Sequence, residues 1–144
     1  MPPTLSAQDA LVAIMITTSA ADERMSTLEL LSINRIIEGL PAFDGYEPER
    51  LRTVSGVVFE ILDAEDGLDA IIGLAKEALP EGFNETAYAL ACDVVAADRQ
   101  VRFPELRWLE ILRRDLGVGR LAAAAIERAA RARHLSLPED TTAQ

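Results

Sequence analysis

The chain has 144 residues, of which 49% are hydrophobic and 26% charged, a balance typical of a soluble globular protein rather than a disordered one. Its net charge of −10 argues against nucleic acid or anionic lipid as the main ligand. The single cysteine, Cys92, excludes an intrachain disulfide framework and fits a reducing compartment.

The N-terminus carries no basic stretch typical of a signal peptide, and the apolar run 10–16 is too short to cross a bilayer. We therefore expect a cytoplasmic protein without direct membrane insertion. Residues 1–98 contain 18 acidic and 5 basic side chains, whereas residues 99–144 contain 6 and 9. Arg128, Arg131, Arg133 and His134 lie near the end of the last predicted helix. The simpler reading is that cations suit a helix C-terminus, and the alternative is a docking patch for an acidic partner.

Helical periodicity runs through almost the whole sequence, and no strand-like alternation interrupts it. Capping residues mark three helix starts: Ser6 with Asp9, Ser26 with Glu29, and Asn84. We expect an all-α fold, a compact bundle of about seven helices forming one domain over 1–134, followed by a disordered tail over 135–144. The predicted helices cover about 7–21, 27–39, 48–63, 68–79, 85–97, 103–116 and 119–134.

The first predicted helix is apolar around its whole circumference, which is typical of a helix buried on all sides. We predict that it packs against the helix over 85–97 at the centre of the domain. Trp108, Leu109, Leu112 and Leu116 form the expected core face of the sixth helix, and Cys92 is read as a packing residue. Asp93 interrupts an apolar stretch and predicts a solvated edge or a buried hydrogen bond, whereas His134 has no obvious partner.

One pattern occurs twice and predicts an internal two-fold repeat. Ala20-Ala21-Asp22 and Ala96-Ala97-Asp98 each follow an apolar helix, and a glutamate comes seven residues after each aspartate. These glutamates are Glu29 and Glu105, in the first turn of the next predicted helix.

The repeated acids, Asp22, Glu29, Asp98 and Glu105, allow two interpretations. In the structural one, each aspartate anchors a turn and each glutamate caps a helix, with no ligand. In the functional one, four carboxylates come together around a hard cation such as Ca²⁺, Mg²⁺ or Mn²⁺. Zinc is not expected, because no set of cysteine and histidine ligands is present, and the spacing is not that of an EF-hand.

The doubled apolar-Ala-Asp-x-x-apolar-x-x-x-Glu pattern resembles the tellurite-resistance TerB family, whose domain also occurs in DjlA-type co-chaperones. The resemblance covers about 8–134, although Glu23 and Arg99 stand where the family usually has glycine. It implies a seven-helix bundle with pseudo-symmetry, a cytoplasmic location, a role in stress responses, and protein partners that include membrane-associated stress proteins. It also implies a metal-binding role for Asp22, Glu29, Asp98 and Glu105.

No phosphate-binding loop and no catalytic Ser-His-Asp or Cys-His set is present, so the sequence predicts no enzyme and no certain cofactor. Two hypotheses remain. The first is a TerB-like stress-response protein that acts as a helical protein-interaction module. The second is a domain that binds or senses a divalent cation, with a cluster of carboxylates as its ligands.

Overall fold

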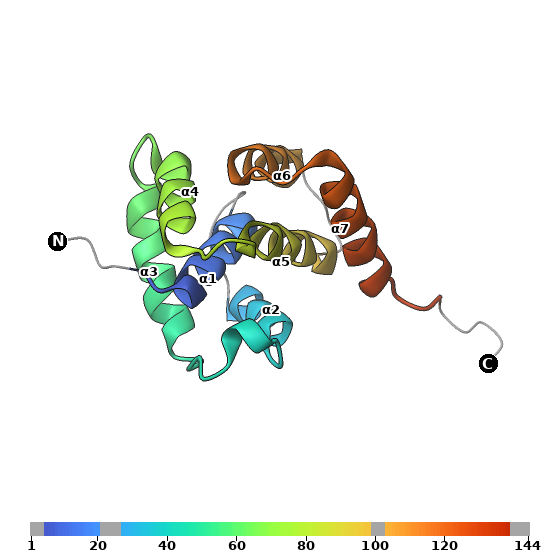
Figure 1. Ribbon diagram of the computed structural model, residues 1–144. Helices are drawn as coiled ribbons and strands as arrows, with labels where there is room; N and C mark the ends of the chain where they lie inside the picture. The colour runs from blue at the N-terminus through green and yellow to red at the C-terminus, as the bar shows by residue number, and fades with distance from the viewer. Residues whose placement is uncertain (1–4, 21–26, 99–102, 139–144) are drawn as a thin grey trace.

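A computed structural model of the chain describes residues 5–20, 27–98 and 103–138, which form seven α-helices, one 3-10 helix and no strand (Figure 1). The prediction of a compact all-α bundle is confirmed for this part of the chain, with each helix boundary within about two residues of its expected position. The internal two-fold repeat stays a prediction. The helices are α1 (Ala7–Ser19), α2 (Thr27–Ile37), α3 (Arg50–Leu62), α4 (Gly67–Ala78), α5 (Phe83–Ala97), α6 (Phe103–Leu116) and α7 (Arg120–Arg133), with the 3-10 helix η1 (Pro41–Phe43) after α2.

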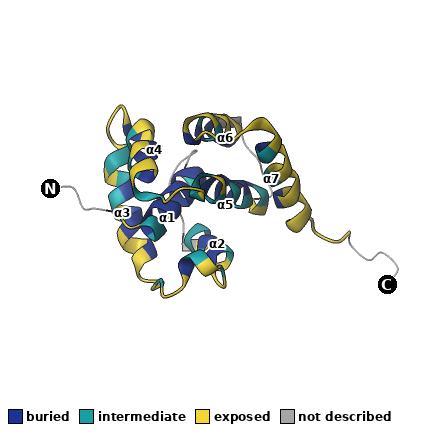
Figure 2. Cartoon of the chain, in the orientation of Figure 1, coloured by how far each residue is buried: buried dark blue, intermediate teal, exposed yellow. Residues whose placement is uncertain are grey.

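Helix α1 lies at the centre of the bundle, as its apolar circumference predicts. Every residue from Ala10 to Thr18 is buried, and α2, α3, α4, α5 and α6 all pack against it (Figure 2). The two threonines of this buried stretch have hydrogen-bond partners within the helix. Thr17 Oγ1 donates to the carbonyl oxygen of Ala13 at 2.8 Å, and Thr18 Oγ1 donates to that of Ile14 at 2.7 Å. The predicted packing of α1 on α5 is confirmed.

The start of α1 is fixed by a capping box and by a buried carboxylate. Ser6 Oγ accepts from the backbone N–H of Asp9, and Asp9 Oδ2 accepts from that of Ser6, as predicted. The structure adds partners from far along the chain: Arg50 Nη2 donates to Asp9 Oδ2 at 2.5 Å, and the Tyr46 hydroxyl donates to Asp9 Oδ1 at 3.2 Å. These contacts connect the start of α1 to the segment that leads into α3.

The predicted cap of α5 is wrong. Helix α5 begins after Gly82, whose φ of +92° lies in the left-handed region that glycine tolerates, and no side chain caps it. Asn84 instead donates from Nδ2 to the carbonyl oxygen of Leu116 at 3.2 Å, which ties α5 to the end of α6. The Ser26 cap of α2 lies outside the described residues.

Helices α6 and α7 both pack against α5 (Figure 1). The predicted core face of α6 is confirmed, because Trp108, Leu109, Leu112 and Leu116 are all buried. Residues 135–138 follow α7 without regular structure, and the rest of the predicted disordered tail lies outside the described residues. In the described ranges, no helix combines the length and the apolar character needed to cross a bilayer.

Candidate functional site

Three of the four predicted site residues line one cavity. Glu29 in the first turn of α2, Asp98 at the end of α5 and Glu105 in the first turn of α6 border a cavity of about 360 Å³. Glu105 is only 5% exposed, Glu29 is half-buried and Asp98 is exposed. Two of these acids lie at helix N-termini, where the aligned peptide dipoles stabilise a negative charge. The remaining lining residues are small or apolar, together with two hydroxyls: Ser19, Leu28, Ser32, Val94 and Ala97.

The ion-binding prediction for this cavity stays a prediction. The fourth acid, Asp22, and Arg99, which could supply a competing cation, both lie outside the described residues. Within the described part of the chain, no group of three or more aspartates, glutamates, histidines or cysteines is arranged to hold a metal ion. The fold therefore brings Glu29, Asp98 and Glu105 to one cavity without forming a metal site from these three acids alone.

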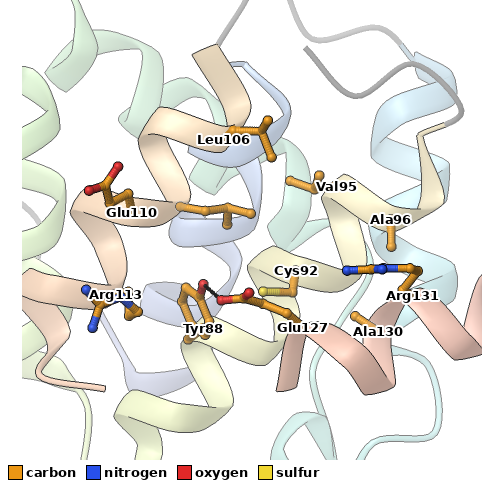
Figure 3. Close-up of a pocket in the computed structure, with 11 residues that line it drawn as sticks. Tyr88, Cys92, Val95, Ala96, Leu106, Glu110, Arg113, Glu127, Ala130 and Arg131 are labelled. Atoms are coloured by element: carbon orange, nitrogen blue, oxygen red, sulfur yellow. Dashed lines mark hydrogen bonds between the residues drawn. The ribbon is translucent and has the colours of Figure 1, made fainter. Parts of the chain in front are cut away.

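A second candidate site is a groove between α6 and α7, with α5 as its floor (Figure 3). Both helices pack on α5 but make few contacts with each other, so they diverge from the short turn that joins them (Figure 1). That turn is well fixed: Gly117 has a φ of +73°, Val118 is buried, and Arg113 Nη1 donates to the Val118 carbonyl oxygen at 3.2 Å. The groove has a volume of about 400 Å³.

The floor of the groove is apolar, and its buried polar groups keep their protons. The Tyr88 hydroxyl donates to Glu127 Oε2 at 2.6 Å. Burial, followed by this hydrogen bond, raises the pKa of Tyr88 far above its usual value, so the phenol remains a donor. Burial also raises the pKa of Cys92 to about 12, so the thiol is not a nucleophilic thiolate at neutral pH. Cys92 is a buried packing residue, as predicted.

Charged side chains stand at the two ends of the groove, and an exposed leucine stands at its rim. Arg113 of α6 lies at one end and Arg131 of α7 at the other, while Leu106 projects from α6 with 52% of its surface exposed (Figure 3). The groove also contains two carboxylates. The carboxylate of Glu127 accepts a hydrogen bond from Tyr88, and the other carboxylate belongs to Glu110 of α6. The sequence did not single out this groove, because it arises from the angle between two helices and not from a residue pattern.

Asp93 and His134 form a contact that the sequence predicted only in part. Arg133 Nη2 donates to Asp93 Oδ1 at 2.6 Å, and His134 Nε2 lies 3.3 Å from the same oxygen. The hydrogen bond expected for Asp93 is therefore present. The expectation that His134 has no partner is wrong, because the packing of α7 on α5 brings together residues some forty positions apart.

Comparison of the chain with protein-family models, with curated proteins and with solved structures found no match in any of the three.

Proposed function

We propose that the chain is a TerB-like stress-response protein of the tellurite-resistance type that acts as a helical protein-interaction module. The observation that carries the interaction is the groove between α6 and α7, with its apolar floor on α5 and the exposed Leu106 at its rim. Two diverging helices over a third make a site of the kind that receives an amphipathic helix from a partner. Burial of the rim leucine and the apolar floor supplies the favourable free energy of such docking.

The occupant that fits best is an amphipathic helix whose apolar face is flanked by carboxylates. Helix α7, one wall of the groove, has four arginines and a single glutamate in a chain whose net charge is −10. Arg113 and Arg131 stand at opposite ends of the groove, so acids at both ends of the docked helix can form ion pairs. The groove also contains Glu110 and Glu127, so the acids of the partner have to lie beside Arg113 and Arg131 rather than beside these two glutamates.

The docking is tested with two designed helical peptides that share one apolar face and carry either glutamates or lysines beside it. We expect the acidic peptide to bind more tightly in fluorescence anisotropy, with an affinity that falls as salt increases. Leu106→Glu should weaken binding at least tenfold. Leu121→Glu is the matched control, because Leu121 is 86% exposed on α7 and lies outside the groove. Equal affinity of the two peptides, or equal losses in the two variants, would overturn the docking proposal.

The stress role needs a separate test in the native cell. Deletion of the gene should lower survival on tellurite, and expression of the wild-type chain should restore it. Leu106→Glu should fail to restore survival if the groove carries the role, whereas Leu121→Glu should restore it. If deletion leaves survival on tellurite unchanged, the tellurite-resistance role is wrong. The docking proposal is not affected by that result.

The alternative proposal is a domain that binds or senses a divalent cation. It is supported by the meeting of Glu29, Asp98 and Glu105 at one cavity, to which Asp22 would add the fourth carboxylate. If Ca²⁺, Mg²⁺ or Mn²⁺ binds there, Glu105→Gln should lower the melting temperature in saturating cation and have little effect in chelator. Glu110→Gln, on the same helix but outside the cavity, is the control. An identical shift for Glu105→Gln in both buffers would contradict cation binding.

A further inference from the structure

We infer that a cleft between α2, α5 and the end of α7 binds a small phosphate monoester. The cleft has a volume of about 580 Å³ and is distinct from the groove and from the acid-lined cavity, although it shares Ala96 with the first and Ser32 and Ala97 with the second. Hydrogen-bond donors face it from two walls: Ser32 and Arg35 on α2, and Arg133, His134 and Ser136 at and after the end of α7. Arginine, histidine and hydroxyl groups are the side chains that recognise phosphoryl oxygens.

The wall formed by α7 is organised before any ligand arrives. A single oxygen, Asp93 Oδ1, lies 2.6 Å from Arg133 Nη2 and 3.3 Å from His134 Nε2, so it holds both side chains at one edge of the cleft. A guanidinium has five N–H donors, and this ion pair uses only part of that capacity. About half of the Arg133 side chain remains exposed and available to a ligand.

The opposite wall supplies an arginine that pairs with no side chain in the described ranges. Ser32 and Arg35 are three residues apart on α2, so they project from the same side of the helix. In the described part of the chain, the Arg35 side chain forms no ion pair and no hydrogen bond. The sequence nevertheless has 24 acidic side chains with which an arginine could pair. An unpaired guanidinium that faces Arg133 across a cleft makes a clamp for an anion with several oxygens.

Two features of the cleft disfavour the binding of an anion, but the hydrogen bonds from its two arginines outweigh them. Asp93 adds a negative charge, and the cleft lies near the C-terminal ends of α2, α5 and α7, where the helix dipoles are negative. Charge-assisted hydrogen bonds from two arginines are stronger than the effect of helix ends that are open to water. The carboxylate of Asp93 also positions Arg133 and His134, which lowers the entropy lost when a ligand binds.

The size and lining of the cleft point to an ester rather than to inorganic phosphate. Inorganic phosphate would leave most of the volume empty, and Ile36 and Leu40 provide an apolar surface beside the donors. A phosphoryl group between Arg35 and Arg133 would leave room there for the organic group that carries it. A nucleoside monophosphate and a phosphorylated serine share this chemistry, and direct titration separates them.

The test is isothermal titration of the full chain with adenosine monophosphate, with a short phosphoserine peptide and with inorganic phosphate. We expect at least one ester to bind at least tenfold more tightly than inorganic phosphate, and the tighter ester identifies the source. Arg35→Gln should weaken that binding at least tenfold without lowering the melting temperature, because Arg35 is exposed and pairs with none of the described residues. Arg128→Gln removes the same charge from an exposed position on α7 outside the cleft and should leave binding unchanged.

Three results would overturn the proposal. The first is the absence of binding for both esters. The second is an affinity for inorganic phosphate equal to that for the esters, which would remove the role of the apolar lining. The third is an equal loss in Arg35→Gln and Arg128→Gln, which would show that only overall charge matters. None of these results bears on the groove between α6 and α7, whose lining includes neither Arg35 nor Arg133.

Discussion

The side chain of Trp108 ties α6 to the central helix through one buried hydrogen bond. Its Nε1 donates to Thr18 Oγ1 at 2.8 Å, and both residues are buried. Thr18→Val keeps the shape of the side chain but leaves the indole N–H without an acceptor. We expect a loss of about 1–3 kcal/mol in the free energy of unfolding, measured as a lower urea midpoint with an unchanged m-value.

Thr17→Val is the matched control for Thr18. Thr17 is equally buried, but its hydroxyl only donates to a carbonyl of the preceding turn, so no donor is left unsatisfied when it is removed. Its loss should stay below about 1 kcal/mol. Equal costs for the two variants would show that the bond to Trp108 does not stabilise the fold.

Asp9 makes stability depend on pH. Burial by itself would raise the pKa of Asp9, but the hydrogen bonds from Arg50 and Ser6 and the charge of Arg50 outweigh it and hold that pKa below its usual value. The ionised form therefore stabilises the fold above the unfolded pKa, which is about 3.9. This contribution is lost as the pH falls through the lower pKa of the folded state.

We expect Asp9→Asn to lower the free energy of unfolding by about 1–2 kcal/mol at neutral pH, a modest value because Arg50 is half exposed. The difference between the variant and the wild type should shrink as the pH falls below about 3.9. Urea midpoints over a pH series provide the measurement. A difference that does not change with pH would mean that the charge of Asp9 is not what stabilises this end of α1.

At the scale of the elements, two glycines of α4 have opposite roles. A Cβ on Gly67 would lie 2.6 Å from the carbonyl oxygen of Ile61 and 2.7 Å from Leu62 Cα, both of them backbone atoms of α3. Gly67→Ala should therefore destabilise the fold by about 1–3 kcal/mol, because the turn between α3 and α4 must open. Gly73→Ala meets no atom within 4 Å and should stabilise the fold by about 0.5–1 kcal/mol.

Thermal melts of both glycine variants test this pair. The sequence presents Gly67 only as a break between two helices, and the close approach that requires it depends on how α4 folds back on α3. A stabilising effect of Gly67→Ala would contradict the close approach.

At the scale of the whole molecule, stability should be highest at the centre and lowest in α7. Helix α1 packs against α2, α3, α4, α5 and α6, whereas α7 packs mainly on α5. We expect the amides of α1 to exchange with solvent only through global unfolding, and those of α7 to exchange through smaller local openings. Native-state hydrogen exchange measures both, and faster exchange in α1 than in α7 would contradict the central role of α1.

Local sequence patterns determined the helices of this protein. Apolar spacing, proline, glycine and capping residues act over about four residues, so the sequence predicts the helix limits and the buried circumference of α1. The same patterns fail where a partner lies far away. Asparagine often caps helices, but the side-chain amide of Asn84 donates to the carbonyl oxygen of Leu116. Likewise, His134 has Asp93 as a partner.

Only the tertiary structure decided which side chains meet between helices. Repeat spacing singled out Glu29, Asp98 and Glu105, and the packing of α2, α5 and α6 places these three at one cavity. The groove beside Leu106 and the cleft between Arg35 and Arg133 follow no sequence pattern, because each depends on the angle at which α7 crosses α5. Such crossing angles are set by the fit of side chains from distant segments, and the period of a single helix does not contain that information.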